Sequence, residues 1–192
     1  MVGILIVDPQ YDFFPGGSLG VKDGNEIIAP INTLLKSHPS ARVFITRDWH
    51  PKASKHFKSG GGIWVAHCLQ QTRGAMFHED IDFPSEAFVY SKGTNPEDDG
   101  GYSGFEGFSE KGKTLLEDLK AQKIDEVIVC GLATDYCVKA TVLDALEAGL
   151  KVQLFAEGMR AVNVNEGDGR GAFQSMLNAG AKEYRARDLQ RS

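Results

Sequence analysis

The chain has 192 residues, of which 42% are hydrophobic, and this size suits one compact domain that spans residues 1–192. The net charge of -5 argues against a nucleic-acid partner, and no apolar run approaches the ~18 residues that a membrane span requires. The three cysteines, Cys68, Cys130 and Cys137, are odd in number and far apart, and the first apolar run lacks a basic leader. We therefore expect a cytoplasmic protein without a signal peptide, a disulfide framework or a membrane partner.

Short β-branched runs alternate with helix-compatible segments along the chain. The expected strands are residues 4–7, 42–46, 87–91, 126–130, 151–156 and, more weakly, 182–185. The expected helices are residues 26–37, 112–122, 137–148 and 170–179. The alternation predicts βαβ units, and hence a single-domain, three-layer α/β/α fold with a six-stranded, mostly parallel sheet.

Polar side chains follow four of these strands. Asp8 comes directly after the first, Asp48 and His50 after the second, Lys92 after the third, and Cys137 after the fourth. In an open parallel sheet, ligands bind outside the carboxyl ends of the strands. We therefore expect these side chains to share one crevice.

Cys137 is the candidate nucleophile. Thr134 or Asp135 can cap the helix that follows, which would leave Cys137 in its first turn, where the helix dipole favours a thiolate. The alternative, a small buried hydrophobe, suits Cys130 inside its apolar strand better, and Cys68 is assigned a packing role.

Asp8 and Lys92 are the candidate partners of the thiol. Taken alone, the first would be an ordinary turn aspartate and the second a solvated lysine. If they lie beside Cys137, the carboxylate can accept the thiol proton and the ammonium can stabilise the resulting anion.

The long segment 49–86 does not fit the alternation, and it contains a run of three glycines and most of the histidines. Asp48, His50 and His67 form a candidate set of ligands for a divalent metal with open coordination positions, and His56 is a weaker fourth candidate. His38 and His78 are interpreted as surface or packing residues.

Several stretches together resemble one enzyme superfamily. They are residues 7–19, VDPQYDFFPGGSL; 48–51, DWHP; 67–70, HCLQ; 74–78, GAMFH; 91–93, SKG; and 131–138, GLATDYCV. In this order they resemble the isochorismatase-like cysteine hydrolases and, through the Asp48, His50 and His67 set, the nicotinamidases within that superfamily.

The resemblance implies roles for individual residues. It implies a catalytic triad of Asp8, Lys92 and Cys137. It also implies a metal ion bound by Asp48, His50 and His67, with His56 near or on the metal. Zn²⁺ is the favoured ion, and Fe²⁺ and Mn²⁺ are alternatives. It also implies an oxyanion hole from the backbone N–H groups of Ala133 and Cys137, with a cis peptide just before Ala133. Phe13, Trp64 and Tyr102 would clamp a substrate ring, and Leu19 would line the same pocket.

The implied activity is hydrolysis of nicotinamide to nicotinate and ammonia through a cysteine thioester, with the pyridine nitrogen on the metal. Pyrazinamide is a second expected substrate, and a homo-oligomer is left open. One alternative is a metal-free relative that acts on another small amide or on an isochorismate-like ether. The other is a catalytically dead member that only binds ligands.

Overall fold

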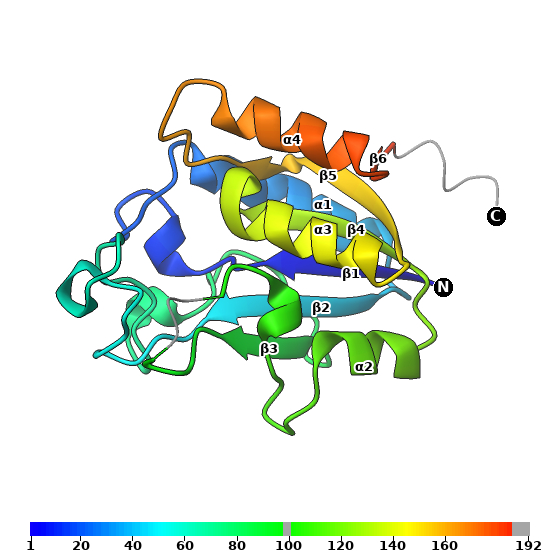
Figure 1. The fold of residues 1–192 in the computed structure, drawn as a ribbon. Coiled ribbons are helices and arrows are strands. Elements are labelled where there is room, and N and C mark those ends of the chain that lie inside the picture. The colour runs from blue at the N-terminus through cyan, green and yellow to red at the C-terminus, as the bar shows by residue number, and fades with distance from the viewer. Residues whose placement is uncertain (98–100, 186–192) are drawn as a thin grey trace.

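The computed structural model describes residues 1–97 and 101–185, and its described strands form one six-stranded sheet in the order β3-β2-β1-β4-β5-β6 (Figure 1). Every neighbouring pair is parallel. The strands are β1 (Val2–Val7), β2 (Arg42–Asp48), β3 (Phe88–Lys92), β4 (Glu126–Leu132), β5 (Lys151–Arg160) and β6 (Lys182–Glu183). The expected six-stranded α/β sheet is therefore confirmed.

Helices cover both faces of the sheet because the side chains of each strand alternate between two apolar clusters. In β1, Ile4 and Ile6 belong to one cluster, while Leu5 and Val7 belong to the other. The helix α1 (Ile28–Ser37) packs on the first cluster, and the helices α2 (Leu115–Ala121), α3 (Lys139–Glu147) and α4 (Asp168–Asn178) pack on the second (Figure 1). The result is a three-layer α/β/α arrangement.

The ends of several elements differ from the sequence-based expectation. The helix α2 begins later than expected, at Leu115, because Thr114 and Glu117 form a capping box. A 3-10 turn (Gly24–Ile27) precedes α1, which begins at Ile28. The strand β5 runs on through an irregular stretch to Arg160, whereas β6 pairs with it over two residues only.

The carboxyl ends of the strands lie at one edge of the sheet, where long loops gather (Figure 1). Asp8 follows β1 directly, while Asp48 and Lys92 are the last residues of β2 and β3 and occupy neighbouring positions in the register. Within the described part of the chain, no helix has the length and apolar character needed to cross a membrane.

Candidate active site

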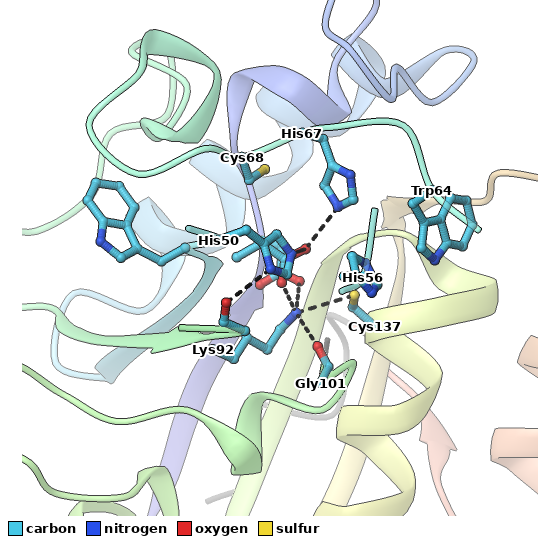
Figure 2. Close-up of polar contacts among 12 residues, drawn as sticks. His50, His56, Trp64, His67, Cys68, Lys92, Gly101 and Cys137 are labelled. Atoms are coloured by element: carbon cyan, nitrogen blue, oxygen red, sulfur yellow. Dashed lines mark hydrogen bonds and ion pairs between the residues drawn. The ribbon is translucent and has the colours of Figure 1, made fainter. Parts of the chain in front are cut away.

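Lys92 lies at the centre of a buried polar group at this edge. Its Nζ atom is 2.9 Å from Asp8 Oδ2 and 3.5 Å from Cys137 Sγ, and it also contacts Asp48 Oδ1. A further hydrogen bond of 3.3 Å reaches the carbonyl oxygen of Gly101 (Figure 2). The side chain is only 1% exposed, so this ammonium interacts with protein groups rather than with water. The structure thus brings together Asp8, Lys92 and Cys137, three residues far apart in the sequence.

Asp8 is held by the neighbouring strand β2. The Thr46 hydroxyl donates a hydrogen bond of 2.6 Å to Asp8 Oδ1, and the Asp8 backbone N–H donates to the Thr46 carbonyl oxygen at 3.2 Å. The residue itself has a left-handed backbone, with φ of 48°. Asp8 Oδ2 forms an ion pair with Lys92 Nζ at 2.9 Å, and the Cys137 thiol also interacts with the Asp8 carboxylate.

The charges of this group are set by burial and by pairing. Burial raises the pKa of Asp8, while Lys92 and the hydrogen bond from Thr46 oppose the increase. Burial also lowers the pKa of Lys92, but the carboxylates of Asp48 and Asp8 outweigh it and hold that pKa well above its usual value. For Asp48, burial is outweighed by Lys92 and by the nearby histidines, so its pKa is well below the usual range. Lys92 and Asp48 therefore form a charged pair.

Cys137 lies in a π-helical turn (Thr134–Val138) that continues directly into the helix α3, so its expected place in the first helical turn holds, but the helical stretch begins at Thr134 rather than at Cys137. The regular helix α3 begins only at Lys139, and neither Thr134 nor Asp135 caps the turn through its side chain. Such π-helical turns are frequent at functional sites.

Asp135 has a long-range structural role instead of capping. Its carboxylate oxygens accept hydrogen bonds from the backbone N–H groups of Val162 and Asn163, at 2.9 and 2.8 Å. The turn that carries Cys137 is thereby fixed to the loop between β5 and α4. The sequence could not reveal this, because the two segments are more than twenty residues apart.

Burial raises the pKa of the Cys137 thiol well above its usual value, and the nearby Lys92 ammonium only partly opposes this. Burial therefore opposes the thiolate that a position at a helix start would favour, whereas Lys92 supports it.

The backbone before Cys137 leaves N–H groups near the thiol. The peptide bond between Leu132 and Ala133 is cis, as expected. The Ala133 carbonyl oxygen accepts hydrogen bonds from the N–H groups of Tyr136 and Val138, both at 3.1 Å. The Ala133 N–H, by contrast, donates no hydrogen bond to any described residue. Ala133 and Cys137 both line a small pocket at this point.

Three buried histidines lie next to Asp48. The Nδ1 atoms of His50 and His67 hydrogen-bond to backbone carbonyl oxygens at 3.0 and 2.8 Å, which directs their Nε2 atoms inwards. These Nε2 atoms lie 3.5 and 3.6 Å from Asp48 Oδ2. His50, His56 and His67 each offer a ring nitrogen, and the three atoms lie within 4.8 Å of one another.

His50 carries the clearest sign of a missing partner. Its Nε2 atom is buried and has no hydrogen-bond partner among the described residues. Buried polar atoms of side chains are nearly always satisfied by a partner, so an unpaired imidazole nitrogen beside Asp48 Oδ2 suits a metal ligand. The neighbouring Gly93 is required here, because a Cβ atom at that position would overlap the His50 ring.

A pocket of mixed aromatic and polar lining opens beside Cys137. The residues Phe13, Leu19, Trp64 and Tyr102, which the resemblance assigns to the substrate, all line it. Trp64 Nε1 donates a hydrogen bond of 2.9 Å to the Tyr102 hydroxyl, across the pocket wall. Tyr136 also lines the pocket and meets Trp64 edge to face at 5.1 Å.

Sequence reasoning missed Tyr136 and Thr46. Tyr136 directly precedes the candidate nucleophile, and Thr46 is a polar residue at the end of an apolar strand, so each gave a weak signal. The other candidates have packing roles: Cys68 and Cys130 are fully buried free thiols. His78 packs against Tyr11.

The isochorismatase domain family matches residues 2–183. The nicotinamidase of Escherichia coli (strain K12) is 40% identical over an alignment of 204 residues, which covers 96% of this chain and 95% of the relative.

Solved structures agree with this. A pyrazinamidase of Pyrococcus horikoshii in complex with zinc has a TM-score of 0.87 at 37% identity, covering 96% of this chain and 98% of that one. PnC1 from L. infantum in complex with nicotinate has a TM-score of 0.82 at 30% identity, covering 97% of this chain and 93% of that one. The resemblance expected from the motifs is thus confirmed, and the chain belongs to the isochorismatase family.

Proposed function

We propose that the protein is a nicotinamidase, which hydrolyses nicotinamide to nicotinate and ammonia. The observation that carries the proposal is the buried Lys92, held between Asp8 and Cys137 beside a pocket lined by histidines and aromatic residues. The relatives named nicotinamidase and pyrazinamidase, and the relative in complex with nicotinate, support this choice of substrate. Pyrazinamide, an amide of similar size, is a second substrate.

Cys137 is the nucleophile and Asp8 is the general base. Asp8 Oδ2 accepts the thiol proton, and the Cys137 sulfur attacks the amide carbon of the substrate. The protonated Asp8 then transfers its proton to the departing ammonia, which leaves a thioester on Cys137. A water molecule, deprotonated by Asp8, hydrolyses the thioester and releases nicotinate.

Backbone N–H groups of Ala133 and Cys137 stabilise the oxyanion formed in both steps. Donors of this kind contribute about 3 kcal/mol each. Lys92 lies within 3.5 Å of the sulfur, so its ammonium stabilises the thiolate that forms when the proton leaves. Its own charge is secured by the two carboxylates, since they keep its pKa high.

A divalent metal fits the residues next to the triad. Asp48 Oδ2 and the inward-facing nitrogens of His50 and His67 would hold it, with the nearby His56 as a further candidate ligand, and the His50 Nε2 atom without a hydrogen-bond partner is the observation that supports this fit. When bound, such an ion supplies an open coordination position for the pyridine nitrogen of the substrate. Zn²⁺ is favoured, in line with the zinc complex of the Pyrococcus horikoshii relative, and Fe²⁺ and Mn²⁺ are alternatives.

The pocket residues position the ring. Phe13 and Trp64 clamp its two faces, while Leu19 and Tyr102 complete the lining. The amide is then directed at Cys137, which lines the same pocket. We also propose a cytoplasmic setting, which is supported by the three free thiols.

Ammonia release from nicotinamide by the purified protein tests the proposal, together with the metal content of the same sample. We expect turnover of nicotinamide and about one divalent ion per chain. Turnover of another small amide or of an isochorismate-like ether, without bound metal, would contradict it. Nicotinamide binding without turnover would instead indicate a catalytically dead member.

A further inference from the structure

Two buried polar side chains of the loop after β1 contact the segments that carry the candidate metal ligands. These side chains, Gln10 and Asp12, have no part in the mechanism described above. Both are buried, Gln10 fully and Asp12 with 9% exposure. Hydrogen bonds to other parts of the protein compensate for the burial of these two polar side chains.

Gln10 holds the backbone of Asp48 from both sides. Its Oε1 atom accepts a hydrogen bond of 2.7 Å from the Asp48 N–H, and its Nε2 atom donates one of 2.7 Å to the Asp48 carbonyl oxygen. The same Nε2 donates to the Ala75 carbonyl oxygen at 2.9 Å. The side chain therefore fixes the position at which the Asp48 carboxylate leaves β2.

Asp12 holds the peptide next to His67. Its Oδ2 atom accepts a hydrogen bond of 2.7 Å from the N–H of Cys68, which has a left-handed backbone with φ of 46°. The carbonyl oxygen of Cys68 in turn accepts a hydrogen bond of 3.0 Å from the N–H of His50. One carboxylate thus supports the segments of two candidate ligands.

The same aspartate also supports the pocket. Asp12 Oδ1 accepts a hydrogen bond from the Ser18 N–H at 3.1 Å, and its backbone carbonyl oxygen accepts one from the Leu19 N–H at 2.9 Å. The space it occupies is kept open by Gly74, because a Cβ atom there would overlap the Asp12 carboxylate.

We propose that Gln10 and Asp12 are positioning residues that hold Asp48, His50 and His67 in a metal-binding arrangement before the ion arrives. The inference rests on the metal site proposed above. Ligands that come from separate segments must be held in place by other groups, and loss of such supporting groups typically weakens metal affinity about 10- to 100-fold. Gln10 acts at Asp48, whereas Asp12 acts at the other two ligands.

The Zn²⁺ affinity of the purified full chain, measured by competition with a chromophoric chelator, tests the proposal. The variants are Gln10→Met, Asp12→Ala and, as a control, Tyr90→Phe. The control removes a buried hydrogen bond of 2.9 Å from the Tyr90 hydroxyl to Asp118, which is not part of the site. We expect a dissociation constant about 10- to 100-fold higher in the first two variants and an unchanged one in Tyr90→Phe. Thermal unfolding of the zinc-free proteins measures how much stability each of the three variants has lost relative to the wild type.

Turnover at saturating Zn²⁺ separates positioning from a general loss of structure. We expect kcat of Asp12→Ala to recover as Zn²⁺ is raised, because the ligands themselves remain. The kcat of Gln10→Met should stay low, because Asp48 also pairs with Lys92.

Wild-type affinity in both folded variants, or an equal loss of affinity in Tyr90→Phe, would overturn the inference while leaving the proposed metal site intact. If Gln10→Met does not fold, Asp12→Ala decides the outcome. A wild-type chain that binds no Zn²⁺ would instead overturn the metal site, and this inference with it.

Discussion

Replacing Thr46 by Val tests whether Asp8 acts as the base. The change removes the hydrogen bond of 2.6 Å from the Thr46 hydroxyl to Asp8 Oδ1 and the one of 3.2 Å that this hydroxyl accepts from the Asp8 N–H, while the N–H still donates to the Thr46 carbonyl oxygen. This hydroxyl lowers the pKa of Asp8, against the larger effect of burial, which raises it. Without the hydroxyl the carboxyl should lose its proton only at higher pH.

The expected decrease in kcat/KM follows from the strength of the hydrogen bond that is lost. A hydrogen bond to a charged group contributes about 1.5–3 kcal/mol, which corresponds to about 10- to 150-fold in rate. Because the base must be ionised, the acidic limb of kcat/KM should move to higher pH, and kcat/KM below that limb should fall by this factor. At higher pH Asp8 is ionised in both proteins, so the difference should shrink.

The assay is ammonia release from nicotinamide across the pH range, with Thr141→Val as the matched control. Thr141 is equally buried, but its hydroxyl accepts a hydrogen bond from the backbone N–H of Gly104 rather than contacting a titrating group. The acidic limb of the control should therefore not move. An unmoved limb in Thr46→Val, with kcat/KM equal to wild type, would refute the assignment of Asp8 as the base.

The remaining predictions concern the nucleophile, the triad and the metal. Cys137→Ala should lower kcat by more than about 1,000-fold, whereas Cys130→Ala, which removes a core thiol of β4, should leave it unchanged; equal losses would exclude Cys137 as the nucleophile. Asp8→Asn and Lys92→Met should each be nearly as damaging, and the double variant little worse, so additive losses in kcat/KM would contradict a triad that acts as one unit. Benzamide, which lacks the ring nitrogen, should react about 100-fold more slowly than nicotinamide, while pyrazinamide should remain a substrate. Chelation of the metal should bring the ratio between nicotinamide and benzamide towards one, and equal rates on both amides with metal bound would refute the orienting role.

The sheet and the residues at its edge were predictable because they follow from local pattern and one topological rule. The alternation of β-branched runs with helical segments predicts a parallel sheet, and the strands of a parallel sheet have their carboxyl ends at one edge. Asp8, Asp48 and Lys92 could therefore be grouped without knowing any contact. Asp48 and Lys92 do occupy neighbouring positions in the register of β2 and β3.

The parts that could not be predicted depend on long-range contacts. The π-helical turn before α3 contradicts the local capping pattern, because Asp135 bonds to the loop at Val162 instead. Likewise, the raised pKa of Cys137 comes from its burial, which the polar residues before it do not reveal. The hydrogen bonds of Gln10 to Asp48 join segments 38 residues apart, so no local pattern encodes them.

Asp48 joins the two halves of the site, because its carboxylate oxygens face different partners. Oδ1 pairs with the Lys92 ammonium, while Oδ2 faces the Nε2 atoms of His50 and His67 at 3.5 and 3.6 Å. When Asp8 is ionised, Asp8 and Asp48 place two carboxylates beside one buried ammonium, which leaves one negative charge in excess. Buried charge is costly unless it is paired or coordinates a metal, so a cation among the imidazoles would offset this excess. The proposed triad and the proposed metal site are therefore electrostatically dependent on each other through a single carboxylate, that of Asp48.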